Sequence, residues 1–274
     1  MKIKDSYKAC IFFLAVISVL HSCKTKSETY FPNPDLSTEK EFSNAQADLN
    51  SIFRDVDYTT QTDTSLRRES EIGYRFTKKD TAVGKYGRVV TIFYENKGRD
   101  GLSRSGKLRC FTNGRRSRGD YRDSVILDSV RINSRMIQGF LVMVQTESKI
   151  LDQWNFTYKA SVVWENQSKS FLTLGVTGLK SKVGLSTKDT KSDIWLIIDT
   201  ITGKNSQGQQ VRATTALTKV FRDSCSYRHP IKGMMDFTNH SSNVIQRIKY
   251  GDGECDDRVT FINEGGWEYA FFVD

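Results

Sequence analysis

Four carboxylates lie within one short stretch near the C-terminus, where oxygen ligands for a metal ion would be sought first. The stretch GDGECDD contains Asp252, Glu254, Asp256 and Asp257, and several carboxylates on one loop are typical of calcium sites. However, the spacing does not follow the D-x-D-x-D-G pattern, and no glutamate stands at the distal bidentate position. Because Gly-Asp-Gly is typical of a hairpin turn, we favour a turn over a calcium site and predict no metal centre.

A second group of residues that could form a functional site is basic. The candidates for an anion-binding site are Arg99, Arg104, Lys107, Arg109, Arg115, Arg116 and Arg118. Strand alternation would place several of them on one face, suited to phosphate, lipopolysaccharide or an acidic glycan. Solvated loop charge explains the same residues more simply, and both interpretations remain open.

Residues for nucleophilic or acid–base catalysis are sparse. The three histidines fit no metal-ligand spacing such as H-E-x-x-H. The sequence contains no G-x-S-x-G elbow, no phosphate-binding P-loop and no dinucleotide fingerprint. His229 follows Cys225 by four positions, but a turn beside Pro230 explains it better than a thiol nucleophile does. Paired carboxylates that cleave a glycan are the one enzymatic alternative, and we predict no cofactor.

The N-terminus has the features of an export signal. Lys2, Lys4 and Lys8 precede the uncharged run IFFLAVISVL, Ile11 to Leu20. A basic start and a short apolar run predict a secretory signal peptide over residues 1–22, because crossing a bilayer takes about 20 apolar residues. Removing this segment, with its three lysines and one aspartate, lowers the formal net charge from +9 to +7.

The end of that segment, Leu20-His21-Ser22-Cys23, resembles the lipobox of bacterial lipoproteins. In that class the chain is cut before the cysteine, and its thiol receives a diacylglycerol with acyl chains such as palmitate. The resemblance implies that Cys23 is the lipid attachment residue and that the protein is anchored to the outer membrane, on its periplasmic or its surface face. Localisation at the outer membrane argues against nucleic acid as a partner, although the chain is basic.

Export places the remaining thiols in an oxidising compartment. Cys10 is lost with the signal peptide, so Cys110, Cys225 and Cys255 remain. Cys110 lies in the strand-like segment KLRCFT and is predicted to be a buried apolar side chain. We therefore predict a disulfide between Cys225 and Cys255, with three free thiols as the alternative.

The elements that position these residues begin with a tether and a helix. Residues 23–37 are polar, contain two of the three prolines and show no periodicity, which predicts a flexible tether. From Thr38 to Val56, apolar residues recur every three or four positions and predict an amphipathic helix. Thr38 and Glu41 fit a capping box. We expect the apolar face to pack on a sheet rather than on a membrane.

From residue 84 onward the pattern changes to period two, with many β-branched and aromatic residues. Twelve segments between residues 88 and 274 are predicted as strands, and the loops between them are too short for crossover helices. The predicted fold is therefore mainly β, an antiparallel sheet of meanders and hairpins. One globular unit, 38–274, would contain the helix 38–56 and a β domain over 84–274, arranged as a sandwich, an open barrel or a curled sheet.

Three motifs carry a more specific resemblance: DGLSRSGK at 100–107, DSVILDSVRINSRMIQG at 123–139 and YGDGECDDRVTFIN at 250–263. Together with EFSNAQADLNSIFRDVD at 41–57, they resemble a group of uncharacterised lipoproteins from Bacteroidetes-type bacteria, in which similar motifs follow the same order. That group often has a glycine-cysteine pair before the first motif, where this chain has YENKGRDG without a cysteine. The resemblance implies a β-rich fold and localisation in the cell envelope, and it implies no activity.

These features predict a membrane-anchored cell-envelope lipoprotein with a non-enzymatic binding or scaffolding role. Its expected partners are the membrane, through the lipid, and an acidic glycan, lipopolysaccharide or an envelope protein. An envelope hydrolase that acts on glycan through acidic residues is the alternative.

Overall fold

In the computed structural model the chain divides into two units, Met1–Asp35 and Leu36–Asp274. The structure describes residues 35–60, 74–83, 86–95, 97–98, 100–113, 121–146, 153–166, 171–183, 193–222, 224–225, 228–239 and 244–273, with backbone only for 74–83, 86 and 171. The predicted signal peptide and lipobox lie outside these ranges, as does the predicted tether up to residue 34. Within the ranges, no helix is long and apolar enough to cross a bilayer.

Within the described ranges, thirteen strands form one antiparallel sheet in which every strand pairs with its neighbours in the chain. The strands are β1 (Tyr74–Val83), β2 (Tyr86–Tyr94), β3 (Arg104–Thr112), β4 (Arg122–Ile132), β5 (Arg135–Thr146), β6 (Gln153–Glu165), β7 (Phe171–Val183), β8 (Ile194–Lys204), β9 (Gln210–Arg222), β10 (Lys232–Asn239), β11 (Gln246–Asp252), β12 (Arg258–Ile262) and β13 (Glu268–Phe272). The order from β1 to β13 is an uninterrupted meander.

The helix α2 (Ser37–Thr60) begins one residue before and ends four residues after the predicted range. Two threonine hydroxyls hold the extra turn, because Thr59 Oγ1 donates to Asp55 O at 2.9 Å and Thr60 Oγ1 donates to Val56 O at 2.8 Å. The Thr60 hydroxyl also lies 2.7 Å from Tyr121 Oη, which connects the helix end to the sheet. Apolar periodicity does not report such bonds, so the prediction ended the helix too early.

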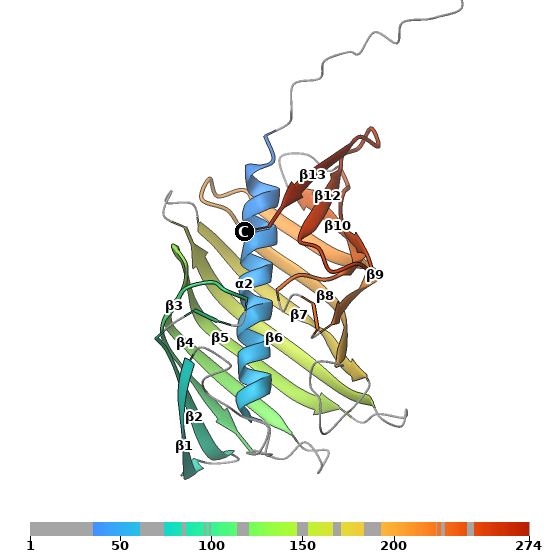
Figure 1. The fold of residues 1–274 in the computed structure, drawn as a ribbon. Helices are drawn as coiled ribbons and strands as arrows, with labels where there is room; N and C mark the ends of the chain where they lie inside the picture. Colours follow the sequence, from blue (N-terminus) through green and yellow to red (C-terminus); the bar gives the residue numbers. More distant parts are fainter. Residues whose placement is uncertain are drawn as a thin grey trace, which may run out of the picture. The chain divides into compact units, whose positions relative to one another are not determined.

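The sheet curves around α2 (Figure 1). Strands β1–β4 lie on one side of the helix, β9–β13 lie on the other, and the middle strands lie behind it. Every residue from Ala45 to Phe53 is buried, including the polar Gln46, Asp48 and Asn50. The sequence predicts one buried helix face, whereas the curvature buries the middle of the helix on all sides.

Aromatic pairs fix both halves of the helix against the sheet. Phe42 packs edge-to-face on Phe237 of β10, with ring centroids 5.2 Å apart. Phe53 packs in the same way on Tyr158 of β6, at 5.3 Å. The two contacts lie three turns apart on α2, so early and late parts of the sheet hold one continuous helix.

Bulges accompany the curvature. The β3–β4 register shifts around Gly106, which has φ +93°, and the β9–β10 register shifts beside Gly233, which has φ +129°. A Cβ at Gly106 would lie 2.5 Å from Ser129 O, and a Cβ at Gly233 would lie 2.8 Å from Lys219 Cα. Only glycine fits these positions without strain, and bulges bend and twist a sheet locally.

The prediction of a mainly β, antiparallel meander with one N-terminal helix is confirmed. The twelve predicted strands correspond to β2–β13, and among the three architectures left open the structure has the curled sheet. The predicted start of the β domain at residue 84 is wrong, because β1 begins at Tyr74 and pairs with β2.

Candidate functional site

The predicted cysteine pair is joined in the structure. A disulfide links Cys225 and Cys255, whose Cα atoms lie 5.1 Å apart, within the range of about 4.4–6.8 Å that a disulfide allows. Cys110 is a free and fully buried thiol. Burial, with the nearby Asp123 carboxylate, raises the pKa of the Cys110 thiol well above its usual value, so this cysteine is unreactive. Cys23 lies outside the described residues.

Arg104, one of the predicted anion-binding residues, points into the interior. Its two terminal nitrogens each lie 2.6 Å from a carboxylate oxygen of Asp100, and Nη2 also donates to Ser51 Oγ of α2. Burial alone would lower the pKa of Arg104, but the charges and bonds of Asp100 and Asp55 raise it. The prediction is wrong for this residue, because its guanidinium already holds partners and lies away from solvent.

The remaining predicted cations divide between the outer face and the undescribed segments. Lys107 and Arg109 are exposed on β3, and Lys107 Nζ lies 3.4 Å from Asp128 Oδ2 of β4. Arg99, Arg115, Arg116 and Arg118 lie outside the described residues.

The acidic loop forms the turn between β11 and β12. Gly253 has φ +112° there, and Lys249 Nζ lies 3.3 Å from Asp252 Oδ1. Among the residues that the structure describes, no three His, Cys, Asp or Glu side chains are grouped as metal ligands.

His229 lies next to this loop, buried beside Arg228. Its Nε2 is 3.9 Å from Asp257 Oδ1. Burial, followed by the Arg228 charge, lowers the pKa of His229 from 6.5 to about 3, so the imidazole is neutral near pH 7.

A buried carboxylate organises the middle of α2. Asp48 is 1% exposed and accepts hydrogen bonds from Arg135 Nε, Trp164 Nε1 and Arg228 Nη2, each at 2.9 Å. These donors come from the start of β5, the end of β6 and the loop between β9 and β10. Asp48 therefore joins distant parts of the sheet to the helix, a role that the sequence analysis missed.

Three buried lysines lie on the inner face of the sheet, and two of them have carboxylate partners. Lys219 Nζ lies 2.7 Å from Asp199 Oδ1, and Lys182 Nζ lies 2.5 Å from Asp193 Oδ2. Lys180, which is 4% exposed, has its Nζ 3.4 Å from the ring centroid of Phe53. Within the described part of the chain, Lys180 forms no ion pair.

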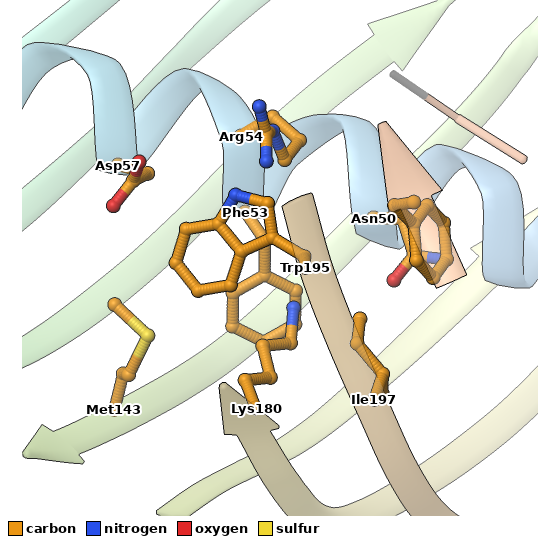
Figure 2. Close-up of a pocket in the computed structure, with 9 residues that line it drawn as sticks. Asn50, Phe53, Arg54, Asp57, Met143, Lys180, Trp195 and Ile197 are labelled. Atoms are coloured by element: carbon orange, nitrogen blue, oxygen red, sulfur yellow. The ribbon is translucent and has the colours of Figure 1, made fainter. Parts of the chain in front are cut away.

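Lys180 lines a small pocket between α2 and the sheet (Figure 2). Asn50, Phe53 and Arg54 contribute from the helix, and Met143, Trp195 and Ile197 contribute from strands. The pocket has a volume of about 20 Å³ and is not fully enclosed, which leaves room for about one water molecule or a group of similar size. Figure 2 shows the Lys180 amine beside the Phe53 ring and the Trp195 indole between the helix and the strands.

Two donors that line this pocket have no hydrogen-bond partner among the residues that the structure describes. They are Asn50 Nδ2 and Trp195 Nε1, and both side chains are more than nine-tenths buried. Leaving a buried donor unpaired costs about 1–3 kcal/mol, so an acceptor atom in the pocket would be stabilised there.

A second concave feature lies on the outer face of the sheet. A groove of about 280 Å³ is lined by Phe140, Lys159, Gly175, Thr177, Thr200 and Thr202, with Ala160 and Val176 in its floor. Phe140 is 51% exposed. The groove therefore combines an aromatic ring, an amine and several hydroxyls on one solvent-facing surface.

Comparisons with known proteins identify no relative. No family model, no curated protein and no solved structure matches the chain.

Proposed function

We propose that the protein is a lipid-anchored component of the bacterial cell envelope that binds an acidic glycan on the outer face of its sheet. The observation that carries this proposal is the groove around Phe140 and the row of side chains that crosses it. The lipid at Cys23 would hold this surface near the envelope polymers.

The row follows the strand register across seven strands. Each residue pairs with the next in the order Arg109, Ile126, Phe140, Ser161, Gly175, Thr202 and Arg212. Six spacings of about 4.8 Å make the row roughly 29 Å long. A cation stands at each end, and an aromatic ring and hydroxyls lie between them, which fits an extended polyanion better than a single sugar.

The chemistry of each group suits a charged carbohydrate. The exposed Phe140 ring offers an apolar face to the C–H surface of a sugar ring. Threonine hydroxyls both donate and accept hydrogen bonds, as sugar hydroxyls do. Lys159 is a point charge that attracts carboxylate or phosphate groups, and the net charge of +7 without the signal peptide favours association with a polyanion.

Binding fits the groove better than cleavage. Glycosidases need two carboxyl groups about 5–9.5 Å apart at the bond they cleave. The eight residues that line the groove are Phe, Lys, Ala, Gly, Val and Thr, so the groove itself offers no acid–base pair. We therefore prefer a binding role to the envelope hydrolase.

The binding test uses polygalacturonate as an acidic probe and dextran as a neutral one, measured by affinity electrophoresis. We expect retardation by polygalacturonate alone, reduced at least tenfold in a Phe140→Ala/Lys159→Gln variant. The matched control, Ile245→Ala/Lys232→Gln, removes an exposed apolar residue and an exposed amine elsewhere and should bind normally. Equal binding by all variants, or equal retardation by dextran, would contradict the proposal, as would binding only to lipopolysaccharide micelles.

The anchor has a separate test. Replacing Cys23 with Ser should abolish labelling by a fatty-acid analogue and release the protein from the membrane fraction. Continued labelling of Cys23→Ser would place the lipid on another residue.

A further inference from the structure

The three buried lysines of the inner face provide an internal comparison. Lys182 and Lys219 each have a carboxylate oxygen within 2.8 Å. The Asp199 carboxylate is fully engaged, because it also accepts from Tyr158 Oη at 2.5 Å and Thr215 Oγ1 at 2.9 Å. Lys180 stands instead over two aromatic rings, 3.4 Å from the Phe53 centroid and 4.7 Å from the Tyr158 centroid.

This environment disfavours the charged form of the Lys180 amine. Burial lowers its pKa well below the usual 10.5, the charges of Arg54 and Lys219 lower it further, and Asp199 opposes them. Asp57 of α2 also lines the pocket, and its Oδ2 lies 3.7 Å from Lys182 Nζ of β7. A ring face stabilises a desolvated cation by less than desolvation destabilises it.

The geometry gives this amine a place to react. Its side chain lines the pocket beside α2, where Phe53, Met143 and Ile197 form apolar walls and Arg54 and Asp57 contribute charged groups. The unpaired donors Asn50 Nδ2 and Trp195 Nε1 line the same pocket. An apolar pocket next to a second cation is the setting in which enzymes activate lysine as a nucleophile.

We propose that Lys180 is a nucleophilic amine and that the pocket takes a small aldehyde as an imine. The neutral Nζ attacks the carbonyl carbon, and one Nζ proton moves to the carbonyl oxygen to give a carbinolamine. The carbinolamine then loses its hydroxyl and the second Nζ proton as water, which forms the C=N bond. Hydrolysis reverses the step, so no oxidant or reductant is needed. Asn50 Nδ2 and Trp195 Nε1 would donate to the oxygen that becomes the leaving water.

The size of the pocket defines the substrate class. A volume of about 20 Å³ is close to the space for one water molecule, so it admits the carbonyl group of a small aldehyde, with any further carbon at the open side of the pocket, rather than a sugar or a cofactor. This inference does not rest on glycan binding, because the pocket and the outer groove lie on opposite faces of the sheet.

The test traps the imine in the full-length folded protein. The protein is treated at pH 7 with acetaldehyde and cyanoborohydride, and ethylated lysines are located by peptide mass spectrometry. An exposed lysine with a pKa near 10.4 is neutral in only about one molecule in 2,500 at this pH. We therefore expect Lys180 to be ethylated at least tenfold faster than Lys159 or Lys232, which are exposed.

Lys182 and Lys219 are the matched controls, because they are equally buried but ion-paired, and they should stay unmodified. The preference for Lys180 should disappear in urea. Trp195→Phe keeps an aromatic side chain and removes the donor. It should slow the ethylation of Lys180 several-fold while circular dichroism stays unchanged. Equal rates at all lysines, or ethylation of Lys182 and Lys219 alongside Lys180, would overturn the proposal, as would an unchanged rate in Trp195→Phe.

Discussion

The two faces of the sheet hold their charged residues in different ways. On the inner face, Arg135 Nε of β5 and Trp164 Nε1 of β6 each donate at 2.9 Å to Asp48 of α2, which is almost fully buried. On the outer face, Arg247 Nε lies 3.3 Å from Asp236 Oδ1, and both side chains are partly exposed. Exposed ion pairs contribute about 0–1 kcal/mol, whereas breaking a buried pair costs about 3–5 kcal/mol. The inner face therefore determines stability, and the outer face is free to carry binding.

The largest expected effect comes from the inner face. Asp48→Ala leaves Arg135, Arg228 and Trp164 without their shared acceptor inside the fold, so we expect the free energy of unfolding to fall by about 3–5 kcal/mol. Urea denaturation followed by circular dichroism measures it. Asp236→Ala on the outer face should change stability by less than about 1 kcal/mol. Similar losses in the two variants would remove the distinction between the faces.

The disulfide should contribute almost as much, from the rim of the sheet rather than from either face. It closes a loop of sequence separation 30, for which the chain-entropy account gives about 3–4 kcal/mol. The Cys225→Ser/Cys255→Ser variant should lose this amount in urea denaturation, and wild-type protein with its disulfide reduced should match it. Reduced wild-type protein as stable as the oxidised form would contradict this expectation.

The buried His229 predicts a pH dependence of intermediate size. Its pKa is lowered from 6.5 to about 3, so between these values the unfolded chain binds a proton that the folded protein does not. The free energy of unfolding therefore falls as the pH decreases below about 6.5, with a limiting slope of about 1.4 kcal/mol per pH unit.

Urea denaturation between pH 7 and 5 measures this contribution, because Asp100 and Asp199, whose pKa values are lowered, titrate below that range. Burial raises the pKa of Asp257, 3.9 Å from His229, so protonation of its carboxyl would oppose the loss of stability at the acidic end. His229→Gln should flatten the dependence. An unchanged slope in the variant would assign the proton uptake to another group.

The smallest expected effect compares two adjacent residues of β8. Ile198 is half exposed on the outer face, and Ile198→Ala should change the free energy of unfolding by no more than about 0.5 kcal/mol. Its neighbour Ile197 is buried on the inner face, and Ile197→Ala should cost about 2–5 kcal/mol. Thermal and urea unfolding of the two variants would test the contrast within one strand.

Alternation along strands made most of the fold predictable from the sequence. The same alternation indicates which face of the sheet Arg104 and Lys180 occupy. Arg104 shares its strand face with Leu108 and Cys110, whereas Lys107 and Arg109 are on the other face. Period two alone therefore placed Arg104 inside, away from the proposed anion-binding group. Lys180 likewise follows Leu174 and Val176 at even spacings and belongs to the buried face.

The partners of these residues were not predictable. Asp48 contacts residues 87 and 180 positions away, and the curvature of the sheet decides which strands reach the helix. The pairing of Cys225 with Cys255 was predictable for another reason, because Cys110 lies within a strand and the other two thiols lie in loops. β1 was missed because lysines and an aspartate interrupt its apolar residues.

The meander order of the sheet has a consequence for how the chain folds. Each strand finds its partner in the neighbouring segment, so most pairings close short loops and form quickly. The helix is the exception, since Gln46 bonds to Tyr250, 204 residues further along the chain. During synthesis from the N-terminus, α2 emerges before the sheet, and its last contacts emerge near the end. Completion of the core is therefore a late, non-local step, and until then the apolar residues of the helix remain available to chaperones.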